Sequence, residues 1–136
     1  MSFVADASIV GAWLLDDEAT PEIERLLDRY AAEQVRAPDV LAHEMRSIAV
    51  KAVRRKRWSQ ADAANLLGRF DMMGLESVAV GESREILRLA LAHGLTAYDA
   101  AYLALARSER LPLATLDAAL RAAAVREGVA LLPERV

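Results

Sequence analysis

Phe3-Val4-Ala5-Asp6-Ala7-Ser8 is the segment that decides the fold of this chain. A short apolar run, typical of a buried strand, ends at an acidic residue and passes directly into a helical pattern at 8–15. Similar apolar runs, followed by acids and helical patterns, recur further along the chain. Repeated alternation of strands and helices is typical of a parallel sheet covered by helices on both faces. The sequence therefore predicts an α/β fold with a mostly parallel, five-stranded sheet.

The bounds of the predicted elements come from apolar runs, cap residues and helix breakers. The strand runs lack polar alternation, as expected for strands buried on both faces of a sheet. Thr20-Pro21 marks a helix start, and Gly94 marks a helix end. We expect strands at 2–6, 35–38, 77–80, 112–116 and 129–132, and helices at 8–15, 21–32, 39–55, 59–73, 82–93, 96–108 and 118–127.

Length and composition limit the function classes. With 136 residues, of which 54% are hydrophobic, we expect one domain over residues 1–136. The formal net charge of −3 differs from the strongly basic balance of dedicated nucleic-acid-binding domains. The absence of cysteine excludes disulfide scaffolds, thiolate nucleophiles and cysteine-bound zinc. We find neither a signal peptide nor an apolar stretch of about 20 residues, and therefore expect a cytoplasmic protein without a membrane segment.

Four acidic residues stand where predicted strands pass into helices. Asp6 ends the first strand, and Glu44 lies about one turn into the helix after the second. Asp99 lies in the first turn of the helix at 96–108, and Asp117 follows the fourth strand. Because the carboxyl ends of parallel strands share one edge of a sheet, these carboxylates are expected to converge. At about 5 Å and an effective dielectric constant of about 20, each pair repels by roughly 3 kcal/mol. Such a cluster requires a cation or raised pKa values.

Helix capping is the structural alternative for each acid taken alone. Aspartate is a preferred N-cap residue, and acids in the first turn favour the helix dipole. Thr96-x-x-Asp99 resembles a capping box, and Ser59-x-x-Asp62 shows the same pattern without a strand before it. Only the set of four therefore favours a functional site. Oxygen ligands without cysteine suit the hard cations Mg²⁺ and Mn²⁺.

The segments around these acids resemble the PIN-domain ribonucleases, and most closely the VapC toxins of bacterial toxin–antitoxin pairs. The likeness extends over nearly the whole chain, in the segments at 3–8, 37–44, 95–104 and 113–117. One departure is Ser47, where many family members carry asparagine, so a supporting hydrogen bond differs. By this resemblance the catalytic, metal-binding acids are Asp6, Glu44, Asp99 and Asp117, with Ser8 and Thr115 as supporting neighbours.

The resemblance also implies a function and partners. It implies a metal-dependent endoribonuclease that cleaves RNA phosphodiester bonds with Mg²⁺ or Mn²⁺. It implies a cognate VapB-type antitoxin that neutralises the enzyme, and a homodimer. It further implies that the complex binds operator DNA only through the antitoxin.

The basic residues of the chain are most concentrated on and just after the helix that carries Glu44. A solvated helix face is the usual meaning of such a run, and the alternative is a surface that binds RNA phosphates. The residues of this predicted RNA-binding surface are Arg46, Lys51, Arg54, Arg55 and Arg57.

Two other functions remain open at the level of the sequence. The first is a receiver-like phosphoacceptor signalling domain, which is also α/β with clustered acids. It fits poorly, because Gly81-Glu82 follows the third predicted strand where a phosphoacceptor is expected. The second is a catalytically inactive PIN-like module that binds RNA.

Overall fold

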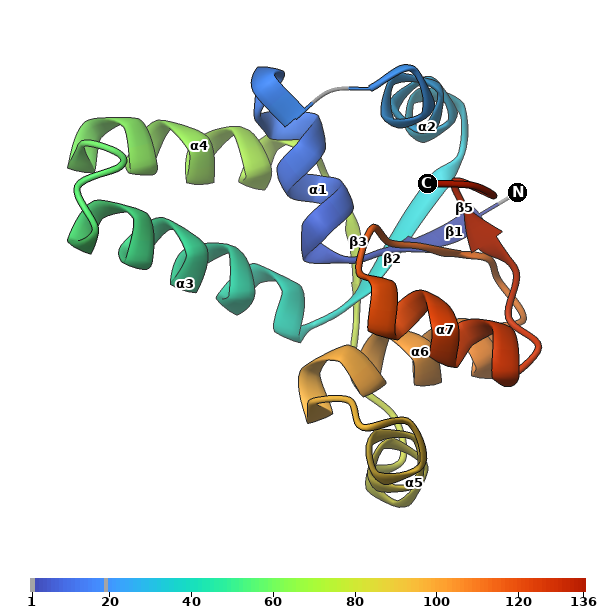
Figure 1. Ribbon diagram of the computed structural model, residues 1–136. Helices are drawn as coiled ribbons and strands as arrows, with labels where there is room; N and C mark the ends of the chain where they lie inside the picture. The colour runs from blue at the N-terminus through green and yellow to red at the C-terminus, as the bar shows by residue number, and fades with distance from the viewer. Residues whose placement is uncertain (1, 19) are drawn as a thin grey trace.

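A five-stranded sheet forms the centre of the computed structural model, which describes residues 2–18 and 20–136 (Figure 1). The strand order is β3-β2-β1-β4-β5, and the four pairings between these strands are all parallel. The predicted parallel α/β fold is thus confirmed. The strands are β1 (Ser2–Ala5), β2 (Gln34–Pro38), β3 (Glu76–Val78), β4 (Leu113–Ala114) and β5 (Leu131–Leu132).

The central strand β1 lies at the point where the direction of the chain connections reverses. From β1 the chain proceeds to β2 and β3 on one side, and it then crosses to β4 and β5 on the other. In open α/β sheets, ligands bind at the carboxyl ends of the strands at such a switch point. Receiver domains have the order 2-1-3-4-5 instead. The receiver-like alternative is therefore wrong.

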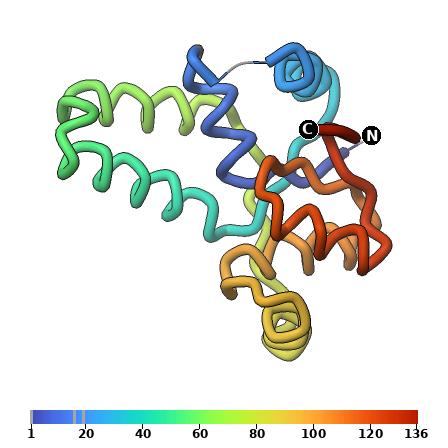
Figure 2. The backbone as a smooth tube through the Cα atoms, in the orientation of Figure 1, coloured from blue at the N-terminus to red at the C-terminus, as the bar shows by residue number. Residues whose placement is uncertain are grey.

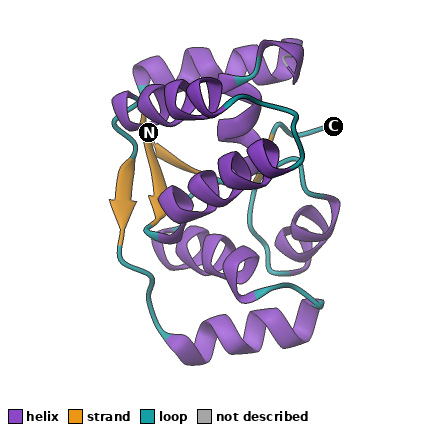
Figure 3. Cartoon of the chain, turned by 90° about the vertical axis from the view of Figure 1, so that its left-hand side faces the viewer, coloured by secondary structure: helices purple, strands orange, loops and turns teal. Residues whose placement is uncertain are grey.

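Seven helices cover the two faces of the sheet in the described part of the chain. Helices α1 to α4 lie on one face and α5 to α7 on the other (Figures 1 and 2). A quarter turn of the view shows the strands between helices (Figure 3). The helices are α1 (Ala7–Leu14), α2 (Pro21–Ala32), α3 (Val40–Arg54), α4 (Gln60–Met72), α5 (Ser83–His93), α6 (Ala97–Glu109) and α7 (Ala118–Arg126), with a short 3-10 turn η1 (Asp16–Glu18) after α1.

Side-chain caps begin several helices where the sequence predicts them. The hydroxyls of Thr20, Ser59 and Thr96 each accept a hydrogen bond from a backbone N–H in the first turn of their helix. Gly94 ends α5 with φ 64°, which a residue without Cβ adopts at no steric cost. The predicted helix bounds are accurate to one residue at each end, whereas the turn η1 is not predicted.

Strands β4 and β5 are shorter than predicted. β4 comprises two residues instead of the expected 112–116, because Thr115 already belongs to the turn into α7 and accepts a hydrogen bond from the Asp117 N–H. β5 also comprises two residues instead of 129–132. Its start is delayed because the Val129 N–H still bonds to the Ala124 carbonyl at the end of α7.

The core is continuous from the sheet into α1 and α6. Phe3, Val4 and Ala5 of β1 are fully buried, and α6 packs on β1 and β2. Phe3 meets the Trp13 ring edge-on, with 6.2 Å between ring centroids. The Trp13 Nε1–H donates to the Ile23 carbonyl at 3.2 Å, which satisfies the polar atom of that ring. None of the helices that the described residues form has the length and apolarity needed to cross a membrane.

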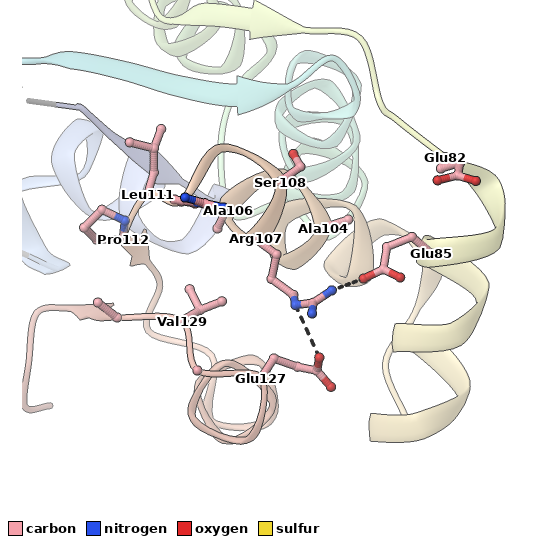
Figure 4. A pocket seen from close by; sticks show the side chains of 13 residues that line it. Glu82, Glu85, Ala104, Ala106, Arg107, Ser108, Leu111, Pro112, Glu127 and Val129 are labelled. Atoms are coloured by element: carbon pink, nitrogen blue, oxygen red, sulfur yellow. Dashed lines mark hydrogen bonds and ion pairs between the residues drawn. The ribbon is translucent and has the colours of Figure 1, made fainter.

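A network of charged side chains joins α5, α6 and α7 around Glu127. Glu127 Oε1 lies 3.1 Å from Arg88 Nη2 and 3.3 Å from Arg107 Nε, and Oε2 lies 2.7 Å from His93 Nε2. Arg107 also pairs with Glu85, so that it bridges two acids (Figure 4). The network borders a cavity of about 720 Å³. Residues that precede β4 and β5 also line this cavity, so it lies toward the amino ends of those strands, opposite the edge that carries the four acids.

Replacing Glu127 by glutamine is expected to lower the free energy of unfolding by about 1–2 kcal/mol at pH 7. Hydrogen bonds with Arg88 and His93 lower the pKa of Glu127 to about 2. A carboxylate with a lowered pKa stabilises the fold above its unfolded-state pKa of about 4.3, and this contribution is lost as the pH falls toward the folded-state value. Water screens the half-exposed Arg88, so the expected loss is smaller than the full shift in pKa implies.

Urea denaturation at pH 7, 4.5 and 2.5 measures this contribution, and the difference between the two proteins should shrink at the lowest pH. Glu82→Gln is the matched control, because Glu82 borders the same cavity and is exposed, without an ion pair among the described residues. Its effect should stay below about 0.5 kcal/mol. An equal loss in both variants at every pH would contradict the role of the network.

Candidate functional site

Asp6 is the most deeply buried of the four acids, with 5% of its surface exposed. It directly follows β1 and caps α1, because Oδ1 accepts a hydrogen bond from the Ile9 N–H at 3.2 Å. Oδ1 also accepts from the Ser8 hydroxyl at 2.6 Å, and Oδ2 accepts from the Thr115 hydroxyl. Burial raises the pKa of Asp6 although these hydrogen bonds oppose the shift, and the charge of Asp99 raises it further.

Ser8 and Thr115 connect Asp6 to the turn that follows β4. Ser8 Oγ accepts a hydrogen bond from the Leu116 N–H at 2.9 Å, and Thr115 Oγ1 accepts one from the Asp117 N–H at 3.0 Å. Each hydroxyl therefore donates to Asp6 and accepts from the backbone on the other side of the switch point. The pair holds the ends of β1 and β4 together at the carboxyl edge of the sheet.

Asp117 begins α7 immediately after this turn. Its Oδ2 accepts a hydrogen bond from the Leu120 N–H at 2.8 Å, so it is an N-cap like Asp6. Capping uses one oxygen of this carboxylate, and the other oxygen accepts no hydrogen bond from the described residues. The structural explanation by capping and a functional role are therefore compatible at this position.

Glu44 reaches the site from the second turn of α3. Its carboxylate is half-buried and accepts a hydrogen bond from the Tyr102 hydroxyl, with 2.6 Å between Oε1 and the hydroxyl oxygen. Burial raises the pKa of Glu44, the Tyr102 hydrogen bond opposes this, and the charges of Asp99 and Asp6 raise it further. Glu44 therefore lies within electrostatic range of two other acids.

Asp99 links the remaining members of the set. It lies in the first turn of α6, where Thr96 caps the helix. Burial raises the pKa of Asp99, and the charge of Asp117 raises it further. Since Asp99 acts on Asp6 and Glu44 as well, all four acids belong to one electrostatically coupled group.

This group fits a hard divalent cation by its chemistry. The donors are carboxylate oxygens, as Mg²⁺ and Mn²⁺ prefer. The carboxylates also carry negative charge that the protein leaves uncompensated, because no arginine, lysine or histidine among the described residues pairs with Asp6, Glu44, Asp99 or Asp117. Among the described residues, no three acidic or histidine side chains lie close enough together to hold a metal ion as they stand.

Two neighbours of the site are absent from the prediction. Tyr102 lies one turn after Asp99 on α6, and this spacing was the signal that could have placed it beside the acids. Arg121 lies one turn after Asp117 and donates to the Thr115 carbonyl at 2.8 Å and to the Pro133 carbonyl at 2.7 Å. Arg121 thus holds the backbone of the β4–α7 turn, and no spacing in the sequence links it to Pro133.

The predicted RNA-binding residues are all exposed on α3 and the turn after it. Glu44 and Arg54 are ten residues apart in the same helix, which corresponds to about 15 Å along its axis. Lys51, Arg55 and Arg57 border a cavity of about 420 Å³ beside η1. The basic residues therefore lead away from the acids along α3.

Comparison with known proteins gives a family match and several similar structures. The PIN domain family model matches residues 3–126. Ribonuclease VapC3 of Pyrobaculum aerophilum is 33% identical over 121 residues, which cover 86% of this chain and 90% of that protein.

Solved structures share the fold at lower identity. The crystal structure of PAE2754 from Pyrobaculum aerophilum has a TM-score of 0.75 at 23% identity, over 98% of this chain and 85% of the other. VapBC2 from Rickettsia felis, bound to a DNA fragment from its promoter, has a TM-score of 0.68 at 13% identity, over 96% and 97%. FitAcB from Neisseria gonorrhoeae has a TM-score of 0.59 at 20% identity, over the full length of both chains.

Proposed function

The chain belongs to the PIN-domain family, and from this premise we propose that it is a metal-dependent endoribonuclease and a toxin of the VapC type. The observation that carries the proposal is the coupled group of four acids at the carboxyl edge of the sheet. The likeness to ribonuclease VapC3 supports RNA as the substrate. Incubation of purified protein with RNA, with Mg²⁺ and with excess EDTA, tests the activity.

The four acids have the roles of metal ligands in this proposal. Asp6, Glu44, Asp99 and Asp117 would hold Mg²⁺ or Mn²⁺, directly or through water. A bound ion of this kind lowers the pKa of a coordinated water and neutralises charge on the scissile phosphate. Ser8 and Thr115 keep Asp6 in place by hydrogen bonds to both of its oxygens. The protein thereby fixes the position of Asp6 before the substrate arrives, which reduces the reorganisation needed at this ligand.

A cognate VapB-type antitoxin is the proposed protein partner. The toxin–antitoxin complexes among the similar structures support this assignment. Two adjoining cavities of about 420 and 340 Å³, between the end of α1 and the α3–α4 pair, share Leu15 and Trp58. They offer a partner chain an apolar surface with charged edges. Operator DNA would be bound only through the antitoxin.

A homodimer is the proposed assembly of the chain itself. Large apolar side chains are exposed on α5 and at the start of α6, namely Leu87 (59%), Leu91 (76%) and Tyr98 (57%). A second copy would remove this apolar surface from water. The mass in solution, measured for the chain alone and after co-expression with the product of a neighbouring gene, tests both partners. An enzyme that acts on cellular RNA would be cytoplasmic.

The basic residues along α3 are the proposed RNA-binding surface. Replacing Arg54, Arg55 and Arg57 together by glutamine is expected to weaken RNA binding. The slope of log K against log[salt] should become shallower by about 2, because each lost phosphate contact to a single strand contributes about 0.7. Fluorescence anisotropy with labelled RNA, in an Asp99→Asn background that prevents cleavage, measures the slope.

The matched control replaces three exposed arginines elsewhere in the chain. Arg84, Arg126 and Arg135 carry the same total charge and lie outside the α3–α4 pair. This triple variant should leave the salt slope within about 0.5 of the parent value. If both triple variants show the same slope of log K against log[salt], the basic residues of α3 form an ordinary solvated helix face and do not bind RNA.

A catalytically inactive PIN-like RNA-binding module remains the second candidate. It shares the fold and the basic surface, and it differs only in lacking cleavage. The presence of all four acids favours the enzyme. RNA binding without cleavage in Mg²⁺ and in Mn²⁺ would favour the inactive module.

A further inference from the structure

Tyr102 is the largest fully buried side chain of the described core, with 1% of its surface exposed. Its ring lies in α6, which packs on β1 and β2, and its hydroxyl donates to Glu44 Oε1 of α3 at 2.6 Å. A phenylalanine would fill the same space. A buried hydroxyl is unfavourable without a hydrogen-bond partner. The hydrogen bond to Glu44 therefore explains why a tyrosine, rather than a phenylalanine, stands at this position.

We propose that Tyr102 is a positioning residue whose hydroxyl holds the Glu44 carboxylate toward Asp6 and Asp99. The inference deepens the proposed metal-dependent activity and rests on it. Through this contact, α6 would supply both a proposed ligand, Asp99, and the group that orients a second ligand on another helix. Tyr102 itself would not touch the metal or the RNA.

In the described part of the chain, Glu44 depends on a single donor from another element, unlike Asp6 and Asp117. Asp6 has three hydrogen-bond donors, from Ser8, Ile9 and Thr115, and Asp117 is held by its own helix. For the Glu44 carboxylate, Tyr102 is the hydrogen-bond donor among the described residues.

Glu44 also has the longest side chain of the four acids and is repelled by two of them. Asp99 and Asp6 disfavour the charged Glu44 carboxylate at its present position. Without the hydroxyl, the flexible side chain would gain rotamer freedom and reduce the repulsion by turning toward solvent. A metal ion would then have to draw it back, so affinity would fall.

The test is Mn²⁺ binding to the purified chain, measured by the electron paramagnetic resonance signal of free Mn²⁺. Tyr102→Phe is expected to raise the Kd for Mn²⁺ by about 10-fold, within the range typical for groups that orient metal ligands. In RNA cleavage, excess Mn²⁺ should restore most of kcat, whereas KM for RNA should not change.

Tyr30→Phe is the matched control, because it removes another hydroxyl hydrogen bond, to the Met73 carbonyl, far in the fold from the acids. It should leave the Kd for Mn²⁺ unchanged. Glu44→Gln should weaken Mn²⁺ binding, and adding Tyr102→Phe to it should cause little further loss, because the two residues act through one contact.

The outcomes separate this inference from the function on which it rests. If the parent chain fails to bind Mn²⁺, the proposed metal site is wrong. It is also wrong if the Glu44→Gln variant binds Mn²⁺ with the same Kd as the parent. If the parent binds through Glu44 and Tyr102→Phe binds equally well, only the positioning role is wrong. Equal losses in Tyr102→Phe and Tyr30→Phe would also overturn it, since the effect would then be general destabilisation.

Discussion

Replacement of Asp99 by asparagine is expected to reduce RNA cleavage at least about 100-fold and to make the metal-free protein more stable. The activity falls because the substitution removes one anionic oxygen from the proposed ligand set. The stability rises because Asp99 is the acid that acts on Asp6, Glu44 and Asp117. Relief of this repulsion should add about 1 kcal/mol to the free energy of unfolding in EDTA.

The matched control for Asp99→Asn is Asp62→Asn. Asp62 occupies the same place in α4 as Asp99 does in α6, with a hydroxyl cap three residues before it. It lacks the neighbouring acids, so its substitution should leave cleavage unchanged. The loss of its favourable interaction with the helix dipole should lower stability by about 0.3–1 kcal/mol. Cleavage rates and urea denaturation measure both effects, and undiminished cleavage by Asp99→Asn would remove the proposed mechanism.

The fold could be predicted from the sequence because its elements are marked locally. Residues such as Thr20, Ser59 and Gly94 begin or end helices through their own side chain or backbone freedom. The lengths of β4 and β5 were overestimated, because the extent of a strand depends on pairing with its neighbour in the sheet. Thr115 is fully buried and its N–H still bonds to the Leu132 carbonyl of β5, yet β4 ends before it, where its hydroxyl bonds to Asp6 and to the Asp117 N–H.

The convergence of the acids was predictable only as a consequence of the topology. Parallel strands bring Asp6 and Asp117 to one edge, whatever the details of packing. The partners of these acids were not predictable in the same way. Tyr102 meets Glu44 across 58 positions of the sequence, and Arg121 reaches a carbonyl of the C-terminal segment. Such contacts depend on how the helices pack on the sheet, which no local pattern records.

The structure also explains why capping and the proposed metal-binding role could not be separated from sequence alone. Asp6 and Asp117 are N-caps, and Asp99 lies in a capped first turn, so each satisfies the local pattern. They differ from Asp62 because other acids lie close enough to interact with them electrostatically. A helix N-terminus partly offsets the charge of an acid there, which helps a fold to tolerate the cluster. Helix capping is therefore compatible with the proposed metal site and helps the fold to tolerate its negative charge.

Removal of divalent metal is expected to abolish cleavage and to lower thermal stability. With Mn²⁺ at about 100 times its Kd, binding to the folded chain adds about 2.7 kcal/mol, which corresponds to a rise in Tm of roughly 5–10 °C. The rise should occur because the cation compensates the repulsion within the group of four acids. Thermal denaturation and RNA cleavage, each followed in EDTA and after addition of Mg²⁺ or Mn²⁺, measure the two effects.

Two controls separate specific binding from screening by salt in this metal experiment. NaCl at the same ionic strength weakens repulsion between exposed charges but acts less on the buried Asp6, so it should raise Tm by much less than Mn²⁺ does. In Asp99→Asn the increase with Mn²⁺ should largely disappear, although that variant starts from a higher Tm in EDTA. Metal removal is thus expected to lower the free energy of unfolding, whereas Asp99→Asn is expected to raise it in EDTA. Both changes are expected to stop cleavage. Undiminished RNA cleavage in excess EDTA would contradict the proposed metal dependence.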